Sequence, residues 1–228
     1  MFAGQDRPLA SSSIRILIAD DHDVVRTGLH ALLETENDFE VCGEARDGRE
    51  ALKEAYRLSP DVVVLDFSMP GMNGLEVTRR IRKALAKTEA LVLTAYDSER
   101  LARSLPSAGA LGYMSKSDAD QDLVVAVHSV HQGRPFFNSR VARMVLEGYL
   151  KPVSDTSPTG EFPYPLTARE REVLQLLAEG KSNKEVGCLM GLTVKIAETH
   201  RAALMRKLGL DSLSDLVRYA ARNRVIEP

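Results

Sequence analysis

The stretch Val62-Val63-Val64-Leu65-Asp66 is a short apolar run that ends at a carboxylate. Three other runs in the first half of the chain also end at residues able to bind metal or phosphate: Ile14–Ala19 before Asp20-Asp21, Leu91–Leu93 before Thr94, and Leu111–Met114 before Ser115-Lys116. Continuous apolar runs of this length are typical of strands buried on both faces of a parallel sheet. Parallel strands bring their carboxyl ends to one edge, where open α/β sheets bind ligands. The pattern therefore predicts a crevice with three carboxylates, a hydroxyl and an ammonium.

Helical periodicity separates these strand-like runs. Apolar residues recur at helical spacing in three segments: Val25, Leu29, Leu32 and Leu33; Val77, Ile81 and Leu85; Leu123, Val127 and Val130. An alternation of strand and helix repeated five times implies right-handed crossovers between parallel strands. We therefore expect a five-stranded, doubly wound parallel sheet between two layers of helices.

The bulk composition narrows the class of protein. The 228 residues are 44% hydrophobic and 27% charged, with a formal net charge of −2, which is typical of globular proteins that bury a core. No apolar run approaches the ~18 residues of a transmembrane helix, so we expect no membrane partner. Cys42 and Cys188 lie far apart and outside any CxxC pattern. Their placement argues against a disulfide framework or a zinc site and favours a reducing cytoplasm.

Changes in composition divide the chain into four parts. Residues 1–13 lack the apolar core of a signal peptide, and we expect a disordered lead-in there. Residues 14–134 carry the strand and helix alternation, and residues 135–164 combine a predicted helix at 139–150 with a linker rich in Pro, Ser and Thr. Residues 165–228 form a smaller domain with 11 Lys and Arg against 8 Asp and Glu, whereas the remainder has 19 against 24. This difference indicates an anionic partner for the smaller domain.

The smaller domain is predicted to contain four helices. Three capping-box patterns mark helix starts: Thr167 with Glu170, Ser182 with Glu185, and Ser212 with Asp215. A further helix is expected from Thr193 to Leu208. The turn Gly191-Leu192-Thr193 joins the second and third helices in the manner of a helix-turn-helix.

The acidic crevice is suited to a metal ion and a phosphoryl group. Asp20 and Asp21 would repel the Asp66 carboxylate at close range, and a hard divalent cation such as Mg²⁺ relieves that repulsion. Asp66 could then attack a phosphorus atom while Lys116 and the metal neutralise the phosphoryl oxygens. The alternative is that these residues only cap strand ends or lie at the surface as solvated charges. Their recurrence on successive strand ends favours a site.

Two sets of motifs resemble known families. ILIADDH, LDFSMPGMNG, LTA and GYMSK, within residues 14–133, resemble the receiver domain of bacterial two-component response regulators. LTAREREVLQLLAEGKSNKEV and ETHRAALMRKL, within residues 165–227, resemble the LuxR-type helix-turn-helix domain of the NarL/FixJ class. The resemblance implies a flavodoxin-like receiver joined to an all-α domain, and hence a transcriptional regulator switched by aspartyl phosphorylation.

The receiver resemblance implies roles for the acidic residues. Asp66 would accept a phosphoryl group from a cognate histidine kinase or a small phosphodonor. Mg²⁺ (or Mn²⁺) would be held by Asp20 or Asp21, by Asp66 and by the main-chain carbonyl of Ser68. A haloacid-dehalogenase-type phosphatase would have an acid in place of Ser68, so a dedicated phosphatase is not expected. Beyond loading and unloading Asp66, we expect no enzymatic activity.

The same resemblance implies a switch. Lys116 would contact the phosphoryl oxygens, and Thr94 would swing toward them, which lets Tyr113 turn inward. In receivers the side chains of the residues at Ser68 and Tyr96 tend to set the dephosphorylation rate. Neither is an acid or amide that would position water well, so we predict a phosphoryl lifetime of minutes or longer.

The output resemblance places DNA recognition on the Thr193–Leu208 helix. Six residues are expected to meet double-stranded DNA: Glu198, Thr199 and Ala202 at bases, and Lys195, His200 and Arg206 at phosphates. The Glu198 carboxylate could accept from a cytosine amino group or remain a solvated charge. Pairing of the last helix, residues 214–224, would form a homodimer on a two-fold symmetric operator.

Three features depart from the family pattern. Pro106 falls inside the predicted fourth helix and would kink or shorten it. Ile196-Ala197 replaces the usual Thr-Val pair. Gly187 replaces an alanine at a cost of roughly 1 kcal/mol in helix propensity, and Cys188-Leu189 beside it is apolar where exposed charge is usual. These changes predict either a less stable domain or a patch that touches the receiver or another subunit. The alternative function is a receiver-type module that acts on a partner protein with little specific DNA binding.

Overall fold

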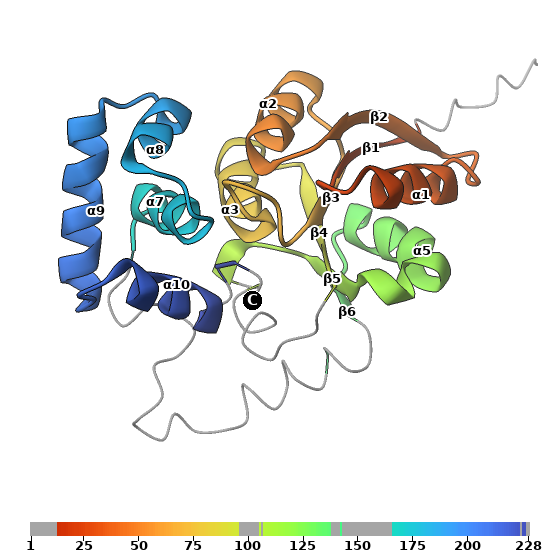
Figure 1. Cartoon of the computed structure of the whole chain (residues 1–228). Helices are drawn as coiled ribbons and strands as arrows, with labels where there is room; N and C mark the ends of the chain where they lie inside the picture. The colour runs from red at the N-terminus through yellow and green to blue at the C-terminus, as the bar shows by residue number, and fades with distance from the viewer. Residues whose placement is uncertain are drawn as a thin grey trace, which may run out of the picture.

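The computed structural model describes residues 13–95, 105, 107–137, 142, 166–223 and 225–226. It shows a parallel sheet covered by helices, followed by a second group of helices (Figure 1). The predicted lead-in up to residue 12, most of the predicted helix at 139–150 and the Pro-rich linker lie outside the described residues. Among the described residues, no helix is long and apolar enough to cross a membrane.

The sheet has the strand order β2-β1-β3-β4-β5-β6, and all neighbouring strands are parallel. The strands are β1 Ile14–Ala19, β2 Phe39–Ala45, β3 Val62–Asp66, β4 Glu89–Thr94, β5 Gly112–Ser115 and β6 Phe136–Phe137. The chain runs from β1 outward to β2 in one direction, and from β3 to β6 in the other. The switch point of the sheet, where α/β folds bind ligands, therefore lies between β1 and β3.

The prediction of five strands was wrong by one. The sixth strand, β6, contains only two residues, Phe136 and Phe137, and pairs with Gly112 and Tyr113 of β5. Two residues are too few to show the alternation or apolar run by which a strand is recognised in sequence. After the helix Ala119–His131, the chain returns to the edge of the sheet, and β6 forms because the backbone N–H of Phe136 donates to the carbonyl of Leu111 at 3.1 Å.

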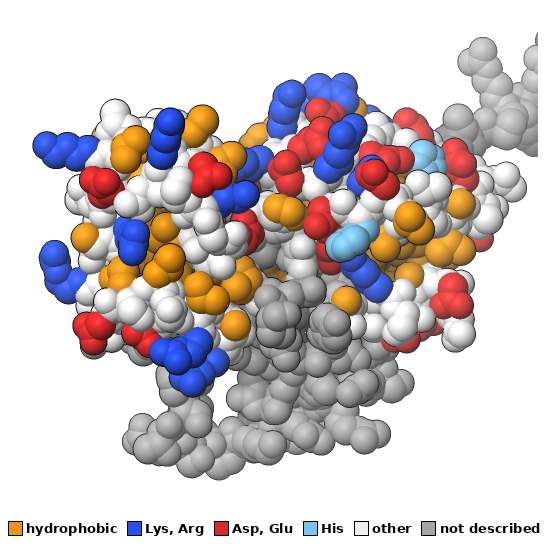
Figure 2. Space-filling model, in the orientation of Figure 1, with side chains coloured by type: hydrophobic (Ala, Val, Ile, Leu, Met, Phe, Trp, Pro, Cys, Tyr) orange, Lys and Arg blue, Asp and Glu red, His pale blue; other side chains and the backbone are white. Residues whose placement is uncertain are grey.

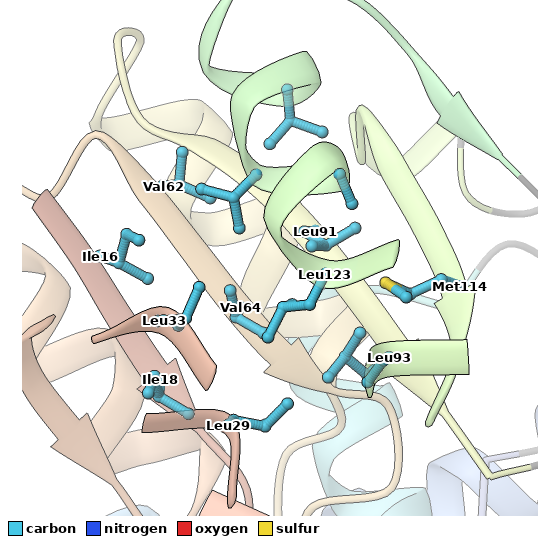
Figure 3. Close-up of a cluster of buried hydrophobic side chains, with 14 of the residues drawn as sticks. Ile16, Ile18, Leu29, Leu33, Val62, Val64, Leu91, Leu93, Met114 and Leu123 are labelled. Carbon is cyan, nitrogen blue, oxygen red and sulfur yellow. The ribbon is translucent and has the colours of Figure 1, made fainter. Parts of the chain in front are cut away.

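Helices cover both faces of the sheet (Figure 1). α1 (Asp23–Leu33) and α5 (Ala119–His131) pack on one face, and α2 (Gly48–Leu58) and α3 (Gly74–Ala84) pack on the other. Side chains of β1 point alternately to the two faces of the sheet. Ile16 and Ile18 join the cluster under α1 and α5 (Figure 3), whereas Leu17 and Ala19 join the cluster under α2 and α3. Burial on both faces explains why the strand sequences are continuously apolar.

The second half folds as four helices, α7 Ala168–Ala178, α8 Asn183–Met190, α9 Val194–Leu208 and α10 Leu213–Arg222. All four contribute to one buried cluster that includes Val173, Val186, Leu204 and Leu216. The capping boxes predicted at Thr167 and Ser182 are confirmed, with both reciprocal bonds formed in each. α8 ends at Met190 with Gly191 as its C-cap, and α9 begins after its N-cap Thr193, which gives the predicted helix-turn-helix.

The third predicted capping box is only half formed. The Ser212 hydroxyl accepts the N–H of Asp215 at 3.1 Å, as a cap does, and donates to the Asp215 carboxylate at 2.6 Å. Aspartate is one methylene shorter than the glutamate of a full box. Its carboxylate therefore meets the serine side chain instead of the serine backbone.

Gly187 has a packing reason for its place in α8. A Cβ at this position would lie 3.0 Å from the carbonyl oxygen of Leu192, in the turn that leads to α9. The glycine thus lets the turn approach the α8 backbone closely, which offsets the loss of helix propensity.

The loop between β3 and α3 folds back on the end of the strand. The N–H of Gly74 donates to the carbonyl of Phe67 at 2.9 Å, and Asn73 caps α3 by accepting the N–H of Glu76. A Cβ at Gly74 would lie 2.3 Å from the carbonyl oxygen of Asp66. A residue without a side chain is therefore needed where α3 begins.

Replacing Gly74 with alanine is expected to lower the free energy of unfolding by about 1 to 3 kcal/mol, because backbone atoms must move to accept the methyl group. Gly28→Ala provides the matched control. Gly28 lies inside α1 with nothing within 4 Å of the added Cβ, so the substitution should raise the free energy of unfolding by about 0.5 to 1 kcal/mol. Urea unfolding of both variants measures the difference, and a Gly74→Ala chain as stable as the wild type would contradict the contact.

Candidate functional site

The carboxyl ends of β1 and β3 bring two acids together at the switch point of the sheet. Ala19 of β1 is in register with Leu65 of β3, so the next residues, Asp20 and Asp66, lie side by side. The Asp20 side chain is fully buried, Asp66 is 2% exposed, and the Asp21 side chain is 26% exposed. One oxygen from each of these acids lies within 4.8 Å of the others. The predicted convergence of three carboxylates is confirmed.

Lys116 places a cation between two of these acids. It follows β5 at the start of a short 3₁₀ helix, Lys116–Asp118. Its Nζ lies 2.7 Å from Oδ2 of Asp20 and 3.1 Å from Oδ2 of Asp66. Burial alone would lower the pKa of this ammonium, but the two carboxylates hold its pKa above the ordinary value. Lys116 therefore stays charged and forms ion pairs with both acids.

The Asp66 carboxylate is held in an environment that disfavours its charge. Burial raises its pKa from the ordinary 3.8 to about 6, and the Asp20 charge acts in the same direction. Lys116 and the backbone N–H of Ser68 act to lower the pKa but do not cancel the effect of burial. The group is charged at neutral pH, yet it lacks full compensation. A carboxylate in this state is a nucleophile that gains from any added positive charge.

The carboxylate oxygens have a donor set that fits a hard cation. Asp20 Oδ2, Asp21 Oδ1 and Asp66 Oδ2 are buried atoms that receive no hydrogen bond of acceptable geometry from the described part of the chain. The Lys116 ion pairs compensate two of them only in part. A buried oxygen without a donor is costly, and Mg²⁺ prefers oxygen ligands from one or two carboxylates, carbonyls and water. These acids therefore match the predicted metal site.

His22 belongs to the acidic group, although the strand-end pattern gives no signal for it beyond its position after the acid pair. Its Nδ1 lies 3.0 Å from Oδ1 of Asp21 and 3.4 Å from Oδ1 of Asp20, and its backbone N–H donates to Asp20 at 2.9 Å. His22 occupies the N-cap position of α1, but its side chain forms no capping hydrogen bond. Its imidazole thus faces the acids.

The two predicted switch residues lie on neighbouring strands. Thr94 ends β4, is 2% exposed, and pairs in register with Ser115 of β5. Its position brings the threonine to the edge of the sheet that carries Asp66, as predicted. Tyr113 of β5 is fully buried in a cluster that includes Phe67 and Leu105, so its ring has the inward placement.

Two residues of the sequence prediction cannot be placed. Tyr96 and Pro106 lie outside the described residues, so the predictions made for them stay predictions. On either side of position 106, Leu105, Ser107 and Ala108 are helical, and Leu105 is fully buried.

The α9 helix has the two faces expected of a recognition helix. Ala197, Leu204 and Leu208 are buried in the output cluster, as predicted. The residues predicted to meet DNA are exposed, except for the half-buried His200: Lys195, Glu198, Thr199, Ala202 and Arg206. Figure 2 shows Lys and Arg side chains projecting from the left side of the molecule, where Figure 1 places α9. The helix therefore presents a polar, partly basic face to solvent.

Comparisons with known proteins agree with both halves of this description. Residues 16–128 match the response regulator receiver domain, and residues 164–220 match the bacterial regulatory proteins of the luxR family. The transcriptional regulatory protein LiaR of Bacillus subtilis (strain 168) is 38% identical over 216 residues, which are 93% of this chain and 99% of LiaR. The oxygen regulatory protein NreC of Staphylococcus aureus (strain bovine RF122 / ET3-1) is 36% identical over 94% of this chain and 100% of NreC.

A solved structure is also similar across both halves. The response regulator ChrA of a heme-sensing two-component system aligns with a TM-score of 0.50 and 33% identity, over 94% of this chain and 100% of ChrA. These matches give no support to the alternative of a partner-binding module without DNA binding. The chain belongs to the NarL/FixJ class of bacterial response regulators, the DNA-binding transcriptional regulators that join a receiver domain to a LuxR-type helix-turn-helix domain.

Proposed function

We propose that Asp66 is the phospho-acceptor of this regulator and that a cognate histidine kinase or a small phosphodonor supplies the phosphoryl group. The observation that carries the proposal is the buried Asp66 carboxylate, set beside Asp20 and Lys116 at the switch point of the sheet. In transfer from a kinase, an Asp66 oxygen forms a bond to phosphorus while the bond from phosphorus to the donor imidazole breaks. The products are an aspartyl phosphate and a free histidine on the donor.

Asp20, Asp21, Asp66 and the main-chain carbonyl of Ser68 would hold Mg²⁺ (or Mn²⁺). The bound ion would supply positive charge to the acids and to the transferring phosphoryl group. Lys116 already lies within ion-pair distance of Asp66, so its ammonium is placed to bind an oxygen of the new phosphoryl group. Catalysis by this chain is then limited to loading and unloading Asp66.

Thr94 and Tyr113 would transmit the change of charge. The phosphoryl group adds acceptor oxygens at the edge of the sheet where Thr94 ends β4, and a hydroxyl there can donate to one of them. Tyr113 lies on the neighbouring strand with its ring buried. Its inward placement would be favoured when Thr94 turns toward the phosphate.

The α9 helix would read promoter DNA. Glu198, Thr199 and Ala202 would face base edges in the major groove, while Lys195, His200 and Arg206 would contact phosphates. All of them except the half-buried His200 are exposed on the side of α9 away from its buried side chains, which supports this assignment.

Two copies of the chain would bind a two-fold symmetric operator by pairing α10. This helix exposes Ser214, Arg218 and Arg222, which lie at helical spacing on the side away from its buried Leu216 and Ala220. Pairing of these faces would place two α9 helices one DNA turn apart.

Phosphorylation of the full chain with acetyl phosphate and Mg²⁺ tests the acceptor. Mass spectrometry should find one phosphoryl group on the wild type and on Asp120→Asn, which changes an exposed acid of α5, and none on Asp66→Asn. Selection of bound sequences from random duplexes, with and without the phosphodonor, should give a two-fold symmetric site for the wild type. Labelling of Asp66→Asn to the wild-type level would exclude Asp66 as the acceptor, and recovery of no preferred sequence would exclude specific readout by α9.

The lifetime of the phosphoryl group gives a second prediction. Because neither Ser68 nor Tyr96 offers an acid or amide to orient water, the label should persist for minutes or longer after the phosphodonor is removed. Ser68→Asn should shorten this lifetime, since an amide can position the attacking water. The decay of the phosphorylated mass gives the rate, and loss of the wild-type label within seconds would contradict the prediction.

Stability against pH gives a third prediction. Because the pKa of Asp66 is raised from 3.8 to about 6, the folded chain binds more protons than the unfolded chain between these values, and stability falls as pH rises through that window. Asp66→Asn should therefore raise the free energy of unfolding at pH 7 without divalent cation, on the order of 1 to 3 kcal/mol. Added Mg²⁺ should stabilise the wild type more than the variant.

Urea unfolding at pH 5 and pH 7, with and without Mg²⁺, measures these differences. Asp120→Asn again serves as the control, and its free energy of unfolding at pH 7 should not rise by a comparable amount. A less stable Asp66→Asn chain at pH 7 would show that the Asp66 charge is fully compensated in the folded protein.

A further inference from the structure

The C-terminal part of α7 is buried on all sides. Every residue from Glu172 to Ala178 is buried, although two of these residues, Glu172 and Gln175, are polar. Val173, Leu174 and Leu177 face the hydrophobic cluster of the output domain. Because the output-domain cluster covers only one side of this helix, another part of the protein must cover the opposite side. Figure 1 shows that α7 lies between α9 and α3 of the receiver.

The second side of α7 carries Glu172, Gln175 and Leu176, and the C-cap residue Glu179 continues this stripe at helical spacing. The stripe meets the loop that follows Asp66. The Gln175 side chain donates to the carbonyl of Met69 at 2.8 Å and accepts the N–H of Asn73 at 2.9 Å. The Glu179 carboxylate accepts the N–H of Gly71 at 2.9 Å. A Cβ added to Gly71 would lie 3.6 Å from the Leu176 side chain, so the loop backbone and this leucine are in contact. The receiver loop and α7 thus form a fitted interface.

Ion pairs fix this interface on both sides of the loop. The buried Glu172 carboxylate pairs with Arg49 of α2 at 2.5 Å and with Arg80 of α3 at 3.2 Å. A second pair has its cation on the output domain and its acid on the receiver: Arg171 of α7 lies 2.9 Å from Glu76 of α3, which is 4% exposed. Removing both receiver arginines from Glu172 would leave its buried carboxylate with only Arg169, at 4.0 Å, which is unfavourable. The receiver and the output domain are therefore docked through specific contacts.

The docked receiver leaves the recognition helix open. The hydrogen bonds and ion pairs that join the described parts of the two halves start from α7 and, through Arg49, from the carbonyl of Leu189 at the end of α8. On α9, Glu198, Thr199 and Ala202 are exposed with the receiver in place. Figure 1 places α9 on the side of the output domain away from the receiver.

We propose that the docked chain is competent to bind a DNA half-site, and that phosphorylation of Asp66 does not act by uncovering α9. This inference rests on the proposed function, in which α9 reads DNA. A ligand shifts an equilibrium only by its difference in affinity for the two states. A half-site that contacts only the open face of α9 meets the same surface in the docked and undocked chains. Docking on α7 therefore changes half-site affinity little, and control falls on the pairing of two chains on the full operator.

The test separates docking from DNA affinity by changing receiver residues alone. Arg49→Ala combined with Arg80→Ala removes both receiver cations from Glu172, while Arg169 and the rest of the output domain stay unaltered. Arg57→Ala is the matched control, since Arg57 is an arginine of α2 that pairs with Glu54 of the same helix. Small-angle scattering of the unphosphorylated full chains reports undocking as a larger radius of gyration. Fluorescence anisotropy reports binding to a labelled duplex with a single half-site, taken from the sequences selected by the wild type.

The double variant should have a larger radius of gyration than the wild type and Arg57→Ala, while all three bind the half-site with Kd values within about twofold of one another. Tightening of about tenfold or more on undocking would show that the receiver blocks α9 and would overturn the inference. Glu172→Lys, which places a lysine beside Arg49, Arg80 and Arg169, is the second variant for undocking. An unchanged radius of gyration in both variants would also overturn the inference. Absence of duplex binding in every chain, with and without phosphodonor, would instead reject the proposed function.

Discussion

The receiver depends on an incomplete balance of charge at the end of β1 and β3. Parallel pairing forces Asp20 and Asp66 together, and the buried surroundings make their repulsion expensive. Lys116 arrives from β5 and compensates this charge only in part, with one ammonium for two buried acids and a third acid beside them. Because positive charge is in short supply, the crevice is sensitive to a bound cation and to a change in the charge of Asp66, since each alters the balance between the acids and Lys116. A fully neutralised crevice would be more stable and would respond less.

Much of this arrangement could be predicted from sequence because it follows from local patterns. Apolar runs that end in Asp66 and in Asp20-Asp21 predict buried parallel strands, and parallel strands bring their ends together whatever the rest of the fold does. Helix caps at Thr167 and Ser182 were predictable for the same reason, since a capping box is complete within four residues.

Features that depend on distant segments could not be predicted in this way. The two-residue strand β6 exists only because β5 offers an open edge after α5 has crossed the sheet. The half-formed box at Ser212 depends on a difference of one methylene that the pattern treats as equivalent. Helical spacing places Glu172 and Gln175 on one side of α7, but from periodicity alone a polar side of a helix is expected to face solvent. Only the fold shows that Arg49, about 120 residues earlier in the chain, covers it.

The two kinds of ionic contact in this protein respond differently to salt. The proposed contacts between the exposed face of α9 and DNA phosphates would exchange with counterions, so they would weaken steeply as the salt concentration rises. The Glu172 side chain is only 2% exposed and its partners Arg49 and Arg80 are partly buried, and salt screens buried or partly buried pairs much less. Over a range of ionic strength the chain can therefore release DNA while its two halves stay together. Under the proposed function, the unit that dissociates from a promoter would be the docked regulator, which could rebind without first reassembling its domains.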